Sequence, residues 1–103
     1  MVNIGDFAIG VDHPALPGHF PGRPIVPGVV LLDEALAIVA AAFGLAAPLR
    51  LLRVKFTAPV APGQRVTVLA EPPADGAMRF ACASGQRPIL SAVAAFDLPG
   101  AVP

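Results

Sequence analysis

One segment of the chain carries almost no charge and has apolar residues on nearly every side of the helix it would form. Residues 28–47 read GVVLLDEALAIVAAAFGLAA, in which Asp33 and Glu34 are the only charges. Gly44 and Pro48 are typical of the end of such a helix. A helix that is apolar nearly all round has to be covered on most sides. The remaining residues must therefore supply a sheet that is large enough to cover it.

After this segment the apolar period changes from that of a helix to that of a strand. In residues 52–57, Leu52, Val54 and Phe56 face one way, and the polar residues between them face the other. The order of elements predicts an α+β fold in one domain over residues 1–103, with a single buried helix and later strands that pair in an antiparallel meander. The predicted strands cover residues 5–11, 52–57, 65–71, 77–84 and 89–97, with turns at 59–63, 72–76 and 85–88.

The bulk composition limits the kind of protein this can be. The chain is 55% hydrophobic, which is more than a small monomer needs, so we expect a homo-oligomer. The formal net charge is zero, which argues against a nucleic-acid partner. Cys82 is the only cysteine, as a reducing cytoplasm permits. The first residues carry no secretory signal, and the uncharged stretch 35–49 is short for a bilayer span, so we expect a soluble cytoplasmic protein without a membrane span.

Residues 12–27 are irregular and hold both histidines of the chain. Five prolines and two glycines in this segment exclude a regular helix or a central strand. An irregular stretch of this length inside a small domain is more often functional than accidental. His19 lies in its middle, and a rigidly held imidazole is suited to act as a general base. The alternative is that His19 only hydrogen-bonds the loop to itself.

Two features of the helix can carry chemistry. An ionised carboxylate is costly to bury without a partner, so a buried Asp33 or Glu34 would have a raised pKa or a bound partner. Adjacent helix positions point about 100° apart, so the two cannot easily share a pocket. Both could lie on an exposed stripe, but their apolar neighbours predict that at least one is covered. The Gly28 N–H at the helix start is suited to a carbonyl oxygen that gains negative charge, although a glycine there is also common at ordinary helix starts.

Other chemistries find little support in the sequence. No serine stands in a nucleophile-elbow pattern, and no glycine-rich phosphate loop is present. Cys82 lies in an apolar strand and is predicted to be core. The two histidines are six positions apart without a cysteine nearby, so no metal site is expected.

The run GHFPGRPIVPGV at residues 18–29, followed by an apolar helix with an acid, resembles the 3-hydroxyacyl-[acyl-carrier-protein] dehydratases of bacterial fatty-acid synthesis (the FabZ and FabA type). The residues VKF at 54–56 and PVAPG at 59–63 look like the strand and turn that follow in that family. The resemblance covers about residues 12–98. It implies a hotdog fold, an antiparallel sheet wrapped around one long central helix. It also implies a homodimer or a larger assembly of dimers, with active sites between the subunits.

The resemblance also implies roles for individual residues. His19 matches the catalytic histidine, and Asp33, fourteen positions later, matches the catalytic acid. Gly28 matches the glycine whose amide polarises the thioester carbonyl. The implied reaction removes water from a 3-hydroxyacyl thioester, carried by acyl carrier protein or CoA, to leave a trans-2-enoyl thioester. No metal or organic cofactor is expected. The basic residues Arg50 and Arg53 with Lys55 are either a solvated strand face or a contact for an acidic carrier protein.

The substrate-binding residues are expected around the helix start, and we include Phe20, Pro27, Val30 and Glu34 among them. The sequence departs from the family's usual pattern at two positions, where Glu34 replaces alanine and Ala37 replaces glutamine. Glu34 could therefore take the acid role. The small size and the altered helix suggest a specialised relative that acts in aryl-polyene, pigment or polyketide synthesis.

Two other functions fit the same fold. A hotdog thioesterase would hydrolyse the thioester, with a carboxylate directing water; the intact histidine run argues against it. A non-catalytic acyl-binding subunit would bind without turnover; the presence of both His19 and Asp33 argues against that.

Overall fold

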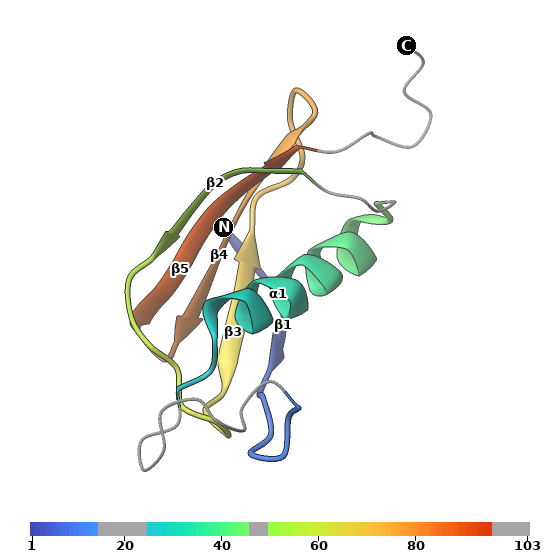
Figure 1. Cartoon of the computed structure of the whole chain (residues 1–103). Coiled ribbons are helices and arrows are strands. Elements are labelled where there is room, and N and C mark those ends of the chain that lie inside the picture. The colour runs from blue at the N-terminus through green and yellow to red at the C-terminus, as the bar shows by residue number, and fades with distance from the viewer. Residues whose placement is uncertain (15–24, 46–49, 96–103) are drawn as a thin grey trace.

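The computed structural model describes residues 1–14, 25–45 and 50–95, which form one helix and five strands. Figure 1 shows the helix lying across one face of a twisted sheet. This arrangement agrees with the predicted α+β layout. Within the described ranges, no helix is long and apolar enough to cross a membrane. The elements in chain order are β1 (Val2–Phe7), α1 (Gly28–Phe43), β2 (Arg50–Phe56), β3 (Val66–Ala70), β4 (Ala77–Ser84) and β5 (Arg87–Ala95).

The five strands form one antiparallel sheet in the order β1-β3-β4-β5-β2. The predicted meander is correct for β3, β4 and β5 but wrong for β2, which pairs with β5 at the far edge instead of with β3. The connection from β2 to β3 runs past the helix start. There the Val26 N–H donates to the Val60 carbonyl at 2.8 Å, and the Gly63 N–H donates to the Ile9 carbonyl at 2.7 Å. These bonds satisfy backbone groups outside the sheet and direct the chain across it.

The core lies between α1 and the inner face of the central strands. The predicted alternation in β3 and β4 is confirmed, because every second residue there is buried. In β4, Met78, Phe80 and Cys82 are each at most 1% exposed. Burial of such side chains is the main source of stability in a domain of this size. The buried residues that face them on β3 and β5 are Val66, Val68, Ala70, Leu90, Ala92 and Ala94.

The helix is shorter and less covered than its sequence predicts. It ends at Phe43, because Gly44 adopts a left-handed conformation with φ 64° and its N–H bonds to the Ala40 carbonyl. The expectation of burial on most sides is wrong for the described chain: one face packs on the sheet, and Val29 on another face is 64% exposed. The buried helix residues are Val30, Leu31, Leu32, Ala35 and Val39. A single layer of strands can cover only one side of a helix.

A glycine in β1 lets the helix pack closely against the sheet. A Cβ at Gly5 would lie 3.0 Å from the Cγ2 atom of Ile38, so a larger residue would require the Ile38 side chain to shift. The strand itself starts earlier than predicted, at Val2 instead of Gly5, and it ends at Phe7. Its length is set by pairing with β3, in which Val2 lies opposite Ala70 and Phe7 opposite Val66.

The predicted turn at 72–76 is confirmed by a tight hairpin before β4. Asp75 and Gly76 both have positive φ, at 55° and 72°. Ala74 and Ala77 exchange backbone hydrogen bonds across them, with N···O distances of 2.9 and 3.0 Å. Two positive φ values in succession are the signature of a type I′ turn, for which Asp-Gly is a favoured pair.

Candidate functional site

The first turn of α1 presents backbone donors that have no acceptor within the helix. Pro27 is the N-cap, with φ −57° and ψ 140°, and no side chain caps the helix there. The Pro27 carbonyl accepts from Val30 N–H at 3.0 Å and Leu31 N–H at 3.4 Å. The N–H of Gly28 precedes these donors and lies at the positive end of the helix dipole. This position suits an oxygen atom that develops negative charge.

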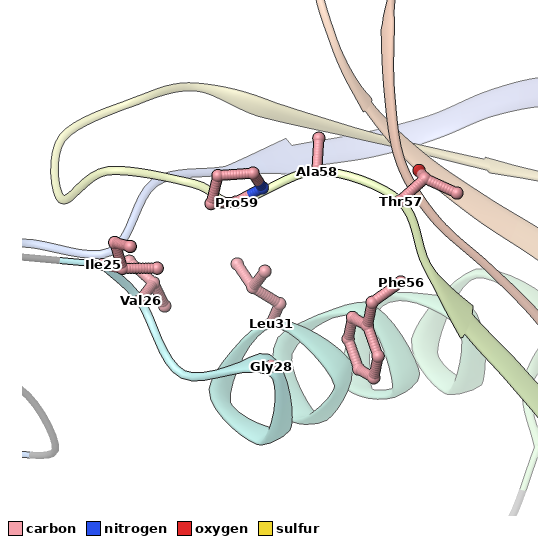
Figure 2. Close-up of a pocket in the computed structure, with 8 residues that line it drawn as sticks. All are labelled: Ile25, Val26, Gly28, Leu31, Phe56, Thr57, Ala58 and Pro59. Carbon is pink, nitrogen blue, oxygen red and sulfur yellow. The ribbon is translucent and has the colours of Figure 1, made fainter.

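The helix start is held against the end of β2 by a close contact. A Cβ at Gly28 would lie 2.9 Å from the Cε1 and Cζ atoms of the Phe56 ring. Real Cβ atoms do not approach other atoms so closely, so a larger residue at position 28 would displace the ring or the helix. Figure 2 shows the ring of Phe56 beside the first turn of the helix. The close approach of the aromatic ring thus favours glycine at position 28.

An apolar pocket of about 500 Å³ opens at this end of the molecule (Figure 2). Gly28 and Leu31 border it from the helix, and the side chain of Leu31 points toward the segment that follows β2. Its volume falls within the range of small-molecule sites. The pocket can therefore hold an acyl group beside the free amide of the helix start. Its lining is Ile25, Val26, Gly28, Leu31, Phe56, Thr57, Ala58 and Pro59.

The two acids of the helix lie in a different environment from the one predicted. Asp33 and Glu34 are both exposed in the described chain, so the expectation that at least one is covered is wrong here. The reason is the single-sided packing of the helix. Asp33 lies one turn from Val29 and one turn from Ala37, which are also exposed. The acid thus stands in an apolar row of the helix that the described part of this chain leaves uncovered.

The remaining predicted site residues fall into two groups. His19 and Phe20 lie outside the described residues, so the pairing of His19 with Asp33 stays a prediction. Pro27 is half-buried at the N-cap, and Val30 is buried in the core. Val30 does not line the pocket described above; Leu31, one position later, does so.

The segment after β2 contributes to the pocket, which the sequence pattern did not predict. Phe56, Thr57, Ala58 and Pro59 form one wall of the pocket, and none of them was predicted to bind substrate. The sequence did contain a sign of this wall, because Pro59 begins a turn directly after the alternating strand. Only the crossing of this segment past the helix start brings the wall and the helix together.

Of the described residues, no cysteine, histidine or carboxylate lines this pocket. Cys82 is buried in β4, as predicted, and burial raises the pKa of its thiol to about 11. A thiol with such a pKa stays protonated near neutrality and is a poor nucleophile. Among the residues that the structure describes, no three His, Cys, Asp or Glu side chains are grouped to hold a metal ion.

Comparison with known proteins identifies the family. Residues 3–94 match the model of the ApeI-like family, whose description is ApeI dehydratase. The chain belongs to the ApeI-like dehydratase family. The match covers the sheet, the helix and the segment that carries the predicted histidine.

The chain is also similar to 3-hydroxyacyl-[acyl-carrier-protein] dehydratases named FabZ, as the sequence motif predicts. It is 44% identical over 45 residues to the enzyme of Chloroflexus aggregans, which covers 44% of this chain and 31% of the relative. It is 38% identical over 73 residues to the enzyme of Chlamydia trachomatis, which covers 61% of this chain and 48% of the relative. The matched part thus spans 31% to 48% of the length of these relatives.

Two solved structures show the same fold. The dehydratase heterocomplex ApeI:P from Xenorhabdus doucetiae matches with a TM-score of 0.74 and 20% identity, covering 90% of this chain and 84% of that one. A mutant of the fluoroacetyl-CoA-specific thioesterase FlK, in complex with fluoroacetate and CoA, matches with a TM-score of 0.61 and 22% identity, covering 87% and 83%. A dehydratase and a thioesterase thus share this architecture, and the predicted hotdog fold is confirmed.

Proposed function

We propose that the protein is a hydro-lyase that converts 3-hydroxyacyl thioesters to trans-2-enoyl thioesters. The observation that carries the proposal is Gly28, whose amide lies at a helix start and borders an apolar pocket. Membership of a dehydratase family agrees with it. An acyl chain in the pocket would bring its thioester oxygen toward this amide. Because the amide stabilises negative charge on that oxygen, it would make the C2 proton easier to remove.

His19 and Asp33 complete the proposed reaction. His19 takes the proton from C2 as the general base, and Asp33 gives a proton to the C3 hydroxyl, which leaves as water. Electrons of the broken C2–H bond form the new double bond as the C3–O bond breaks. Glu34, next along the helix, is the alternative acid. Phe20 would contact the acyl chain, and no metal or organic cofactor takes part.

The proposed site is completed by a second copy of the chain. Asp33 lies on an exposed apolar row of the helix, which a neighbouring subunit would cover. β2 is an edge strand, whose outer backbone groups have no strand partner within the described residues. Three apolar residues of β2 are also exposed: Leu51, Leu52 and Phe56. We therefore propose a homodimer, or a larger assembly of dimers, in the cytoplasm.

The substrate is proposed to reach the site on an acyl carrier protein, with CoA thioesters as simpler analogues. The FabZ relatives are named for carrier-protein substrates. The pathway is proposed to be fatty-acid synthesis or a related route to aryl polyenes, pigments or polyketides. A heterocomplex, as in the ApeI:P structure, is the alternative to a homodimer.

The experiment that tests the function is turnover of short and medium enoyl and 3-hydroxyacyl thioesters, on CoA and on carrier protein. His19→Ala and Asp33→Asn should each lower kcat by at least ~100-fold, as expected for loss of a general base or acid. Glu34→Gln tests the alternative acid and should keep its kcat if Asp33 supplies the proton. Loss with Glu34→Gln and not with Asp33→Asn would transfer the acid role.

The same assay separates the other candidate functions. Release of free thiol would identify a thioesterase. Binding of thioesters without any turnover, in folded wild-type protein, would contradict the enzyme and leave an acyl-binding subunit.

A further inference from the structure

The chain that leaves β2 is fastened to β5 directly after Phe56. The Thr57 N–H donates to the Ile89 carbonyl at 2.8 Å, and the Ala58 N–H donates to the same carbonyl at 3.4 Å. The Thr57 hydroxyl also donates to the Pro88 carbonyl at 3.0 Å. Ile89 is fully buried, so the residue that accepts two of these bonds is itself fixed in the core. The backbone that carries the Phe56 ring therefore has a fixed place relative to the sheet.

The helix start is held from two sides. Before the helix, the Val26 N–H donates to the Val60 carbonyl at 2.8 Å. At the first helical residue, one edge of the Phe56 ring fills the space in which a Cβ of Gly28 would stand. The Cε1 and Cζ atoms lie 2.9 Å from that point, and the Cδ1 atom lies 3.4 Å from it. The ring stands beside the first turn of the helix (Figure 2), so it limits how far this turn can move toward β2.

Gly28 depends on an outside contact for a fixed orientation. Glycine has more backbone freedom than any other residue. No side chain of the described residues caps the helix at Pro27, so the first turn lacks a side-chain hydrogen bond of its own. An amide that stabilises a developing oxyanion must lie about 2.7–3.1 Å from that oxygen. A misplacement of ~1 Å can lower a rate by ~100-fold, so the contact that fixes this amide matters for the reaction.

We propose that Phe56 is a positioning residue, whose ring edge holds Gly28 so that its amide N–H is aimed at the thioester oxygen. This inference rests on the proposed function and adds a residue to it. The ring has no polar atom and cannot donate to the oxygen, so it acts through Gly28. The hydrogen bonds of Thr57 to β5 hold the ring in place.

Phe56 also borders the pocket, so its part in positioning must be separated from a part in binding the acyl chain. A wall residue contacts the chain in the ground state and in the transition state alike, so its loss raises KM. A positioning residue acts on charge that develops only in the transition state, so its loss lowers kcat for every chain length. Ile25 borders the same pocket and serves as the comparison for a wall.

The first test is hydration of enoyl thioesters of increasing chain length. Phe56→Ala should lower kcat by roughly tenfold for every chain length, with KM changed by less than about twofold. Phe56→Leu restores apolar bulk and should stay within about threefold of the wild-type kcat. Ile25→Ala should instead raise KM, most for the longest chains. Phe7→Ala makes the same change on the other edge strand and is the matched control, which should keep its kcat.

A spectroscopic measurement reports on the amide directly. The absorption of 2,4-hexadienoyl-CoA moves to longer wavelength when a hydrogen-bond donor polarises its carbonyl. The compound is bound at saturation to His19→Ala protein, which lacks the proposed base. The resulting red shift should fall by at least about half when Phe56→Ala is added, because the amide no longer holds its place. Adding Phe7→Ala should leave the shift unchanged, since lower stability alone does not alter the spectrum of a bound ligand.

The two measurements also separate this proposal from the proposed function. An unchanged kcat and an unchanged red shift in Phe56→Ala would overturn the positioning role. So would a rise of KM alone that grows with chain length, which would make Phe56 a wall of the pocket. An equal loss of kcat in Phe7→Ala would overturn it as well, by indicating general destabilisation. Absence of turnover by the wild type, with a red shift that Phe56→Ala still reduces, would contradict the dehydratase and leave the positioning role in place.

Discussion

The strands β2 and β4 both carry apolar residues at alternating positions but lie in different surroundings. β4 reads AMRFACAS and β2 reads RLLRVKF, and both alternate apolar with other residues. In β4, Phe80 is fully buried, whereas Phe56 in β2 is 50% exposed. β4 lies at the centre of the sheet beneath the helix, and β2 lies at its edge. Alternation therefore tells which face a residue takes, but the position of its strand decides whether that face is covered.

The largest difference is expected between alanine substitutions of these two phenylalanines. Phe80→Ala should lower the free energy of unfolding by about 3–5 kcal/mol, because it leaves a cavity in a closed core. Phe56→Ala should lower it by about 1 kcal/mol or less at low protein concentration, since half of that ring is already in water. Urea unfolding followed by circular dichroism measures both. Equal losses of unfolding free energy in the two variants, at every protein concentration, would contradict the difference between a central strand and an edge strand.

A smaller effect is expected at the contact between β2 and the helix. Gly28→Ala should destabilise the protein by about 2 kcal/mol, because the added methyl would lie 2.9 Å from the Phe56 ring. In a double-mutant cycle, Phe56→Ala should remove most of this loss, since it removes the atoms that clash. If the loss persists without the ring, the requirement for glycine arises from the backbone instead.

The buried thiol of β4 predicts a pH dependence. Burial raises the pKa of Cys82 from 9.0 to about 11, so the folded state keeps the proton that the unfolded state loses. Its stabilising contribution is therefore complete below pH 9 and is lost as the pH rises toward 11. At pH 10 the wild type should have lost about 1.4 kcal/mol more than Cys82→Ala, relative to pH 7. Unfolding free energies of both proteins at the two pH values measure this difference. If the unfolding free energies of the wild type and of Cys82→Ala change equally with pH, the thiol is hydrated in the folded protein.

The smallest effect on folding, with the clearest effect on assembly, is expected at the edge of β2. Leu52 is 54% exposed, so Leu52→Glu should change the stability of the single chain by less than about 0.5 kcal/mol. It should nevertheless weaken the proposed homodimer, because it introduces a charge into the apolar edge. Sedimentation velocity of this variant beside Thr67→Glu, on the other side of the sheet, gives the comparison. A wild type that stays monomeric at all concentrations would contradict the proposed assembly.

Several elements follow directly from local patterns. The strand over residues 77–84 has the predicted bounds, and Asp75 with Gly76 forms the predicted turn before it. The helix starts at Gly28 as expected. These features depend on side-chain period and on backbone conformations that only a few residue types favour, so neighbours in sequence suffice to specify them.

Other features could not be read from neighbours in sequence. The pairing of β2 with β5 depends on how the segment after Phe56 crosses the helix start. The pocket at Gly28 forms only through that crossing, so its wall was missed. The exposure of Asp33 depends on what covers the helix, and that surface is not part of the described chain.

The sequence by itself determined the fold class, the family motif and the identity of the candidate catalytic residues, because these reside in periodicity and in a contiguous run of residues. The tertiary structure decided the strand order, the uncovered side of the helix and the contact of Phe56 with Gly28. These depend on contacts between residues far apart in the chain. Such contacts form only when the whole sheet has folded, since the alternation of each strand is satisfied equally well at a central or an edge position.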